Sequence, residues 1–160
     1  MKTKTYNVYY FDELSKEAQE KALERYYDIN VCYDDWYYSE PDYSIIDLKA
    51  FDLYRETIVI DFKESAEKTA QTILVEYGKH CKEYILSKSF LKEYKKALKN
   101  NKNNEYEDVC VNLENDYREE LAQCYLDNLQ QQYDYLTSGE AIKETFEANE
   151  YQFTIDGKID

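Results

Sequence analysis

The alternation of apolar and polar residues predicts an opening strand, a helix and then a pair of strands. Thr3 to Phe11 is rich in residues that favour strands. Ser15 has the position of a helix N-cap, and an apolar repeat of helical period continues from it to about residue 30. Two β-branched runs, residues 44–54 and 56–62, follow, and a turn near Tyr54 to Glu56 predicts that they pair antiparallel.

The second half of the chain has the period of helices. Gly78 is a plausible stop for the first of them, and the NNKNN sequence at residues 100–104 predicts a loop. Thr137 or Ser138 has the position of the last N-cap. In chain order the predicted elements are helices from Ser65 to about Gly78, over 79–99, over 105–136 and around residues 141–146, then a strand over 151–155 and a turn at Asp156-Gly157.

This order predicts an α+β fold, in which a small antiparallel sheet packs against several helices. The helix over 105–136 would be the longest, roughly 48 Å at the usual rise per residue. We expect residues 1–160 to form one domain, and the pattern leaves open whether the first and last strands pair. The sequence contains neither a long apolar run nor a signal-peptide pattern, so we expect a cytoplasmic protein without membrane contact.

The net charge of −14 is distributed unevenly along the chain. Residues 1–62 carry 7 basic and 14 acidic groups, residues 63–102 carry 10 and 5, and residues 103–160 carry 3 and 15. The long predicted helix is therefore acidic, with Arg118 as its single basic residue. Such asymmetry indicates association guided by charge with a basic partner, and it argues against direct binding of nucleic acid by the acidic surfaces.

The aromatic acidic stretch, residues 26–47, combines seven aromatic residues with six carboxylates and contains neither Lys nor Arg. Tyr and Trp dominate protein-binding surfaces because each has a large apolar body and a polar tip. We therefore select partner-binding candidates from this stretch and from the acidic helix. The candidates are Asp28, Asp34, Asp35, Trp36, Tyr37, Tyr38, Glu40, Asp42, Glu107, Glu114, Glu119 and Glu120.

The sequence offers little for catalysis. With three glycines it has no Gly-rich phosphate loop, and His80 and Cys81 are adjacent rather than arranged as a nucleophile and its base. The four cysteines lack metal-binding spacing and read as free, mostly buried thiols. We expect no enzymatic activity, cofactor or metal ion; Asp34-Asp35 as a metal-dependent catalytic pair is a third and weaker alternative.

The acidic helix and the basic segment each allow two hypotheses about their role. Carboxylates spaced along a rod can imitate the phosphates of a duplex, and tyrosines can stack on Arg side chains of a nucleic-acid-binding protein. An acidic face can equally serve solubility alone. For the basic helices within residues 63–102 we expect internal ion pairing with the acidic helix rather than contact with phosphate.

Both ends of the chain resemble a known family. YYFDELSKEAQEKALERYYDINVCYDDWYY, residues 9–38, and YDYLTSGEAIKETFEANEYQFTIDGKI, residues 133–159, are similar to small acidic proteins of bacteriophages and mobile elements, which carry hypothetical or antitoxin-like labels. The FDELS-x-EA-x-x-KA pattern is the most specific part; the residue after Trp36 is Tyr37 where family members have a second Trp. The resemblance implies a phage genomic context, in which proteins of this size and acidity are often inhibitors of host defence, including anti-CRISPR and anti-restriction proteins.

Two functions therefore follow as hypotheses. The first is a phage-type anti-defence inhibitor in the cytoplasm of the host bacterial cell, which binds the basic nucleic-acid channel of an effector, partly as a DNA mimic. The alternative is an antitoxin-like protein that neutralises a toxin through its Tyr and Trp surface, with charge mainly steering association.

Overall fold

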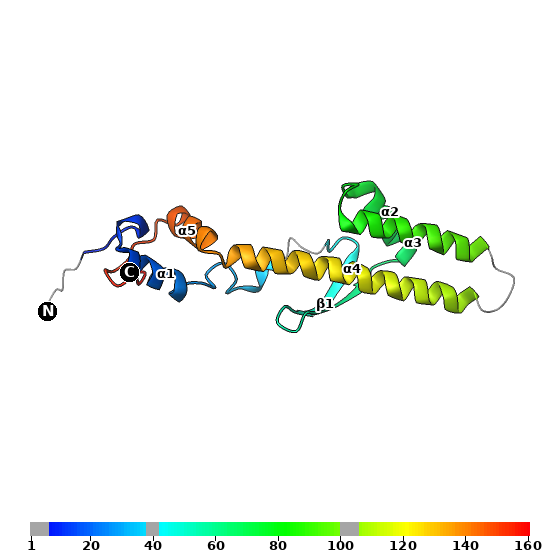
Figure 1. The fold of residues 1–160 in the computed structure, drawn as a ribbon, viewed down its shortest axis with the longest axis horizontal. Coiled ribbons are helices and arrows are strands. Elements are labelled where there is room, and N and C mark those ends of the chain that lie inside the picture. Colours follow the sequence, from blue (N-terminus) through cyan, green and yellow to red (C-terminus); the bar gives the residue numbers. More distant parts are fainter. Residues whose placement is uncertain (1–6, 38–41, 100–105) are drawn as a thin grey trace. The chain divides into compact units, whose positions relative to one another are not determined.

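The computed structural model describes residues 7–37, 42–99 and 106–160. The chain divides into two compact units: the terminal unit, residues 1–38 and 131–160, and the central unit, residues 39–130. Figure 1 shows the elements in chain order. They are η1 (Phe11–Glu13), α1 (Lys16–Arg25), η2 (Asp34–Tyr37), β1 (Ile46–Asp52), β2 (Thr57–Phe62), α2 (Ala66–Glu76), α3 (Lys82–Lys99), α4 (Tyr106–Leu136) and α5 (Gly139–Ala148).

The predicted α+β class is confirmed. β1 and β2 form a two-stranded antiparallel sheet, and α4 is the long helix expected from the sequence. Serine caps mark three helix starts where the sequence places them: Ser15, Ser65 and Ser138 each accept a hydrogen bond from the backbone N–H three residues later. Among the described helices, none is long and apolar enough to cross a membrane.

The central unit buries one face of the sheet against its helices. Ile46 and Ile60, on β1 and β2, join Ile73 of α2 and Leu121 of α4 in a single apolar core. The strand register shifts between Leu48 and Ala50, so β1 contains a bulge. The core also holds a stack of aromatic rings, in which Tyr117 of α4 lies against Phe90 and Phe62.

The terminal unit has a separate core built from the two ends of the chain. Phe11, Ala22, Phe146 and Phe153 are all buried in it. Phe153 pairs with Tyr9 and with Ile159 through isolated antiparallel bridges. The two ends of the chain therefore meet through a single bridge between Tyr9 and Phe153 rather than through a ladder.

Three predicted boundaries in the terminal unit are wrong. The first helix ends at Arg25 instead of near residue 30, because the following residues form turns and Asn30 bonds elsewhere. The Asn30 amide donates to the Leu136 carbonyl at 2.9 Å and accepts from the Thr145 hydroxyl at 2.6 Å. The opening strand gives way to η1 at Phe11, and the final strand is limited to bridges because the chain turns back at 154–158. Thr3 to Tyr6 and the predicted loop at 100–104 lie outside the described residues.

Candidate functional site

The outer face of α4 carries an acidic strip, which we define as Asp116, Glu119 and Glu120. Their spacing of three and four residues places them together on the helix surface, and all three side chains are exposed. Among the described residues they form neither ion pairs nor hydrogen bonds with other side chains. Of the candidates, Glu119 and Glu120 therefore lie where a partner can reach them, and Asp116 joins them although the sequence did not single it out.

Glu107 is exposed in the first turn of α4. A carboxylate there stabilises the positive end of the helix macrodipole, so it has a structural role besides any contact with a partner. Glu107 is accessible, and it stands about 20 Å along the helix axis from Glu120 at the usual rise per residue.

Glu114 was predicted to contact a partner, but it is partly buried inside the central unit. The Tyr94 hydroxyl donates to its carboxylate at 2.9 Å. This hydrogen bond, together with burial, raises the pKa of Tyr94 to about 12. The Glu114 carboxylate is therefore hydrogen-bonded to a side chain of α3, and we assign it a structural role in the packing of α3 on α4.

Asp42 is likewise partly buried and bonded within the central unit. Its carboxylate accepts from the Ser44 backbone N–H at 2.9 Å and from the Tyr77 hydroxyl at 3.3 Å. The Tyr77 hydroxyl also lies 3.3 Å from that of buried Tyr125. Asp42 therefore connects the start of the sheet to α2 and α4.

The part of the aromatic acidic stretch that belongs to the terminal unit exposes different aromatic residues from those selected. Tyr27 is 53% exposed and Tyr33 is 76% exposed, and the carboxylates of Asp28, next to Tyr27, and Asp35, two residues after Tyr33, are exposed as well. Neither tyrosine was among the candidates. Each has a carboxylate next to it in the sequence, whereas the half-buried Tyr26 and Tyr37 do not, so an adjacent carboxylate is a signal that could have singled out the two exposed tyrosines.

Trp36 and Tyr37 are half-buried. The Trp36 ring lies 5.6 Å from the Tyr37 ring and 5.6 Å from the ring of Tyr133 on α4, with edge-to-face geometry. Trp36 thus contributes to packing of the terminal unit. Asp34 belongs to η2, while Tyr38 and Glu40 lie outside the described residues.

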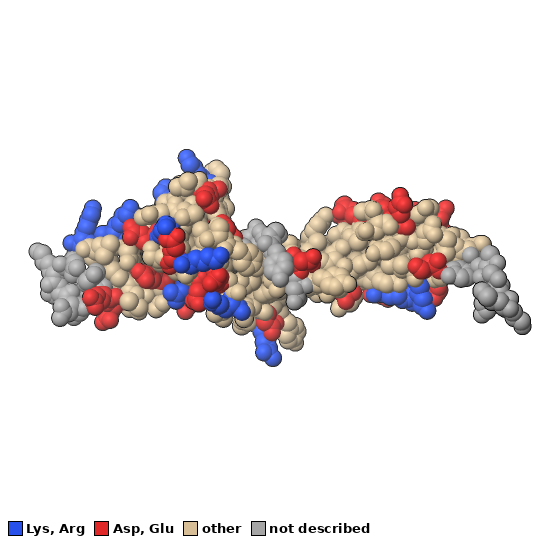
Figure 2. Space-filling view, turned by 180° about the vertical axis from the view of Figure 1, so that it is seen from behind, with Lys and Arg blue, Asp and Glu red and all other residues tan. Residues whose placement is uncertain are grey.

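The expected pairing of the basic helices with α4 is limited, among the described residues, to one ion pair, Lys82 with Asp127 at 2.9 Å. The remaining lysines of α3 recur at intervals of three and four residues, which places them on one exposed face. Figure 2 shows basic side chains along the edge of the central unit that α3 forms. We call Lys88, Lys92, Lys95, Lys96 and Lys99 the lysine stripe.

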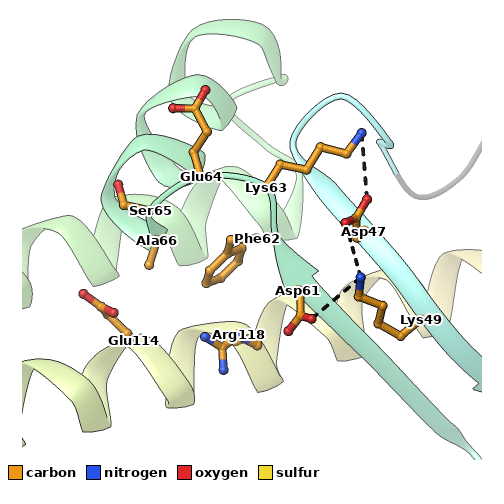
Figure 3. Close-up of a pocket in the computed structure, with 10 residues that line it drawn as sticks. All are labelled: Asp47, Lys49, Asp61, Phe62, Lys63, Glu64, Ser65, Ala66, Glu114 and Arg118. Carbon is orange, nitrogen blue, oxygen red and sulfur yellow. Dashed lines mark hydrogen bonds and ion pairs between the residues drawn. The ribbon is translucent and has the colours of Figure 1, made fainter.

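An open hollow of about 590 Å³ lies between β2, the start of α2 and α4 (Figure 3). Its walls mix charges of both signs: Lys49 pairs with Asp47 at 3.3 Å and with Asp61 at 3.9 Å. The Arg118 guanidinium lies 5.3 Å from the centre of the Phe62 ring and donates to Asn115. Lys49 is thus paired with carboxylates of the unit, and Arg118 contacts uncharged groups of it, so we do not assign a ligand to this hollow.

Within residues 7–37, 42–99 and 106–160, no group of three or more His, Cys, Asp or Glu side chains is arranged to hold a metal ion. The four thiols are free, and burial raises the pKa of Cys124 to about 11, so this thiol stays protonated at neutral pH.

Comparison of the chain with known protein families, with curated proteins and with solved structures gives no match.

Proposed function

We propose that the protein is a non-enzymatic, phage-type anti-defence inhibitor, acting in the cytoplasm of the host cell. It binds the basic nucleic-acid-binding surface of a CRISPR or restriction effector and competes with DNA for that surface. The observation that carries the proposal is the acidic strip of α4, whose carboxylates are exposed and not neutralised by the lysines of the neighbouring helix.

The acidic strip is unfavourable for the isolated protein. Asp116 lies three residues from Glu119 and four from Glu120, and like charges at such spacings destabilise a helix by about 0.2–0.5 kcal/mol per pair. Neutral Gln at these positions would keep the helix propensity and remove the repulsion. A cost to stability at exposed positions is typical of residues kept for binding.

A rigid helix also suits imitation of a nucleic-acid backbone. α4 holds its carboxylates at fixed spacing, and a protein that binds DNA through Lys and Arg gains affinity when a polyanion releases its counterions. Binding of this kind should weaken steeply as salt rises. Removal of three carboxylates should reduce both the affinity and its dependence on salt.

This leads to a test with two matched triple variants. The strip variant carries Asp116→Asn, Glu119→Gln and Glu120→Gln, and the control carries Glu20→Gln, Glu24→Gln and Glu140→Gln, which are exposed carboxylates of the terminal unit. Both raise the net charge by three.

The measurement is inhibition of duplex DNA binding across a panel of purified CRISPR and restriction effectors. We expect stoichiometric inhibition of one effector, about 10–100-fold weaker for the strip variant and within threefold of wild type for the control, since three exposed charged contacts at roughly 0.5–1 kcal/mol each amount to about 1.5–3 kcal/mol. Equal inhibition by both variants would show that the carboxylates of the acidic strip do not contribute to binding of the effector. Inhibition of no effector in the panel contradicts the proposed function.

The antitoxin-like alternative has one observation in its favour, the exposure of Tyr27 and Tyr33. Large exposed tyrosines are typical binding anchors, and truncation of an anchor costs about 2 kcal/mol or more. Under this alternative Tyr33→Ser should weaken toxin binding about 30-fold at any salt concentration, while the strip variant should act on the association rate alone. Surface plasmon resonance at two salt concentrations separates these outcomes.

A further inference from the structure

The terminal unit contains a second hollow, of about 260 Å³, whose lining is aromatic and acidic. Two buried rings, Phe11 and Phe146, belong to its lining, together with the half-exposed ring of Tyr10 and the partly buried ring of Tyr151. A single water occupies about 30 Å³, so the space admits a long side chain. All of its lining residues belong to the terminal unit.

The rings of this hollow are fixed by contacts with one another. The centre of the Phe146 ring lies 5.4 Å from that of Phe11 and 6.2 Å from that of Tyr151. Packing of Phe146 in the core therefore holds the neighbouring rings in place. Aromatic rings attract cations to their faces, most often the guanidinium of arginine.

Three carboxylates complete the lining: Asp12, Glu147 and Glu150. Lys143 already bonds two of them, with its Nζ 3.0 Å from Asp12 and 3.5 Å from Glu147. Glu150 forms no ion pair among the described residues. With Lys143 included, the hollow has a net charge of −2, and Glu150 is the carboxylate left for an incoming cation.

Glu150 occupies a backbone position that normally favours glycine. α5 ends in a Schellman motif: the Tyr151 N–H donates to the Phe146 carbonyl at 3.0 Å, and the Glu150 N–H donates to the Glu147 carbonyl at 3.1 Å. Glu150 has φ of 53°, in the left-handed region. Its carboxylate also stands at the negative end of the helix macrodipole. Replacement by Gly should therefore stabilise the fold. A loss of ligand binding in this variant could then not be attributed to unfolding.

We propose that this hollow binds the guanidinium of an arginine side chain, between the accessible rings of Tyr10 and Tyr151 and the Glu150 carboxylate. The inference rests on the proposed function in one respect, that the arginine belongs to a basic protein partner. Arginine is favoured over lysine because its planar group stacks on rings while donating two parallel hydrogen bonds to a carboxylate.

The test uses a small probe, Nα-acetyl-arginine N-methylamide, titrated into the full-length protein and followed by NMR. The matched probe is the citrulline analogue, which has nearly the same shape without the charge. We expect saturable shifts of the Tyr151 and Phe146 amides with the arginine probe, and at least tenfold weaker binding of the citrulline probe, because the charged contact is lost.

The protein variants are Glu150→Gly and Glu150→Gln, with Glu20→Gln, an exposed carboxylate of α1, as the control. Glu150→Gly should raise the melting temperature by about 2–4 °C, and both Glu150 variants should weaken arginine binding about tenfold. Affinity equal to wild type in both Glu150 variants, or equal shifts with the two probes, overturns the proposal.

This experiment is separate from the test of the acidic strip, since it needs no effector and leaves α4 unchanged. If effectors are not inhibited while the arginine probe binds through Glu150, the hollow is an arginine site but the partner assigned to it is wrong. If inhibition depends on the acidic strip while the probe fails to bind, the proposed function remains and the hollow does not contribute an arginine site.

Discussion

A Tyr117→Ala variant is expected to lower the free energy of unfolding of the central unit by about 3–5 kcal/mol. Tyr117 is 2% exposed, and its ring stacks on that of Phe90 with centres 4.3 Å apart and on that of Phe62 at 5.5 Å. Its hydroxyl lies 2.7 Å from the hydroxyl of fully buried Ser87. Truncation would remove the middle ring of the stack and leave Ser87 without this partner.

The control for this variant is Tyr117→Phe, which keeps the ring and removes the hydroxyl alone. Loss of the hydrogen bond to Ser87 should cost about 1–3 kcal/mol, because a buried polar group is left unpaired. Urea denaturation followed by near-ultraviolet circular dichroism gives both values. If the Ala variant is no less stable than the Phe variant, the stack does not support the unit.

A Gly157→Ala variant is expected to destabilise the terminal unit by about 2–4 kcal/mol. Gly157 has φ of +75°, and an added Cβ would lie 2.4 Å from the Ala18 carbonyl oxygen of α1. That oxygen belongs to helix backbone and cannot move aside without displacing α1 from the core. The turn at 154–158 therefore packs closely against α1 only because residue 157 has no side chain.

Trp36 fluorescence reports on this change, because it is the single tryptophan of the chain and belongs to the terminal unit. The matched control is Gly139→Ala in the same unit, where an added Cβ would meet the Leu23 side chain at 3.5 Å, an ordinary van der Waals contact. That substitution should be neutral or stabilising by up to about 1 kcal/mol, since it restricts the unfolded chain. Equal effects at the two glycines would show that the turn at Gly157 tolerates a side chain.

Much of the fold follows from local sequence signals. Ser65 and Ser138 cap helices where the pattern predicts, and the β-branched runs before and after Tyr54 pair as a hairpin. These signals act over a few residues, so they can be read without knowledge of the tertiary structure. The early end of α1 cannot be read this way, because Asn30 bonds residues more than 100 positions away.

The candidate site was less accessible to sequence reasoning. Glu114 and Glu119 look alike in the sequence. In the fold, the Tyr94 hydroxyl of α3 donates a hydrogen bond to partly buried Glu114, whereas Glu119 is exposed. In the same way, the Trp36 ring packs against Tyr133 of α4, whereas the Tyr33 side chain is exposed to solvent. The lysine stripe has a helical spacing that indicates one exposed face, but the sequence analysis expected these lysines to pair with the acidic helix.

The separation of charge within the central unit has a consequence for the way a partner arrives. The lysine stripe lies on α3 and the acidic strip on α4, with one described ion pair between the two helices. This arrangement gives the unit an electric dipole in addition to its net charge. A basic surface approaching within a Debye length, about 8 Å at physiological salt, therefore exerts a torque as well as an attraction. With a basic partner of the kind proposed above, the unit would rotate so that α4 faces the partner before contact, and the orientation would be selected during the encounter.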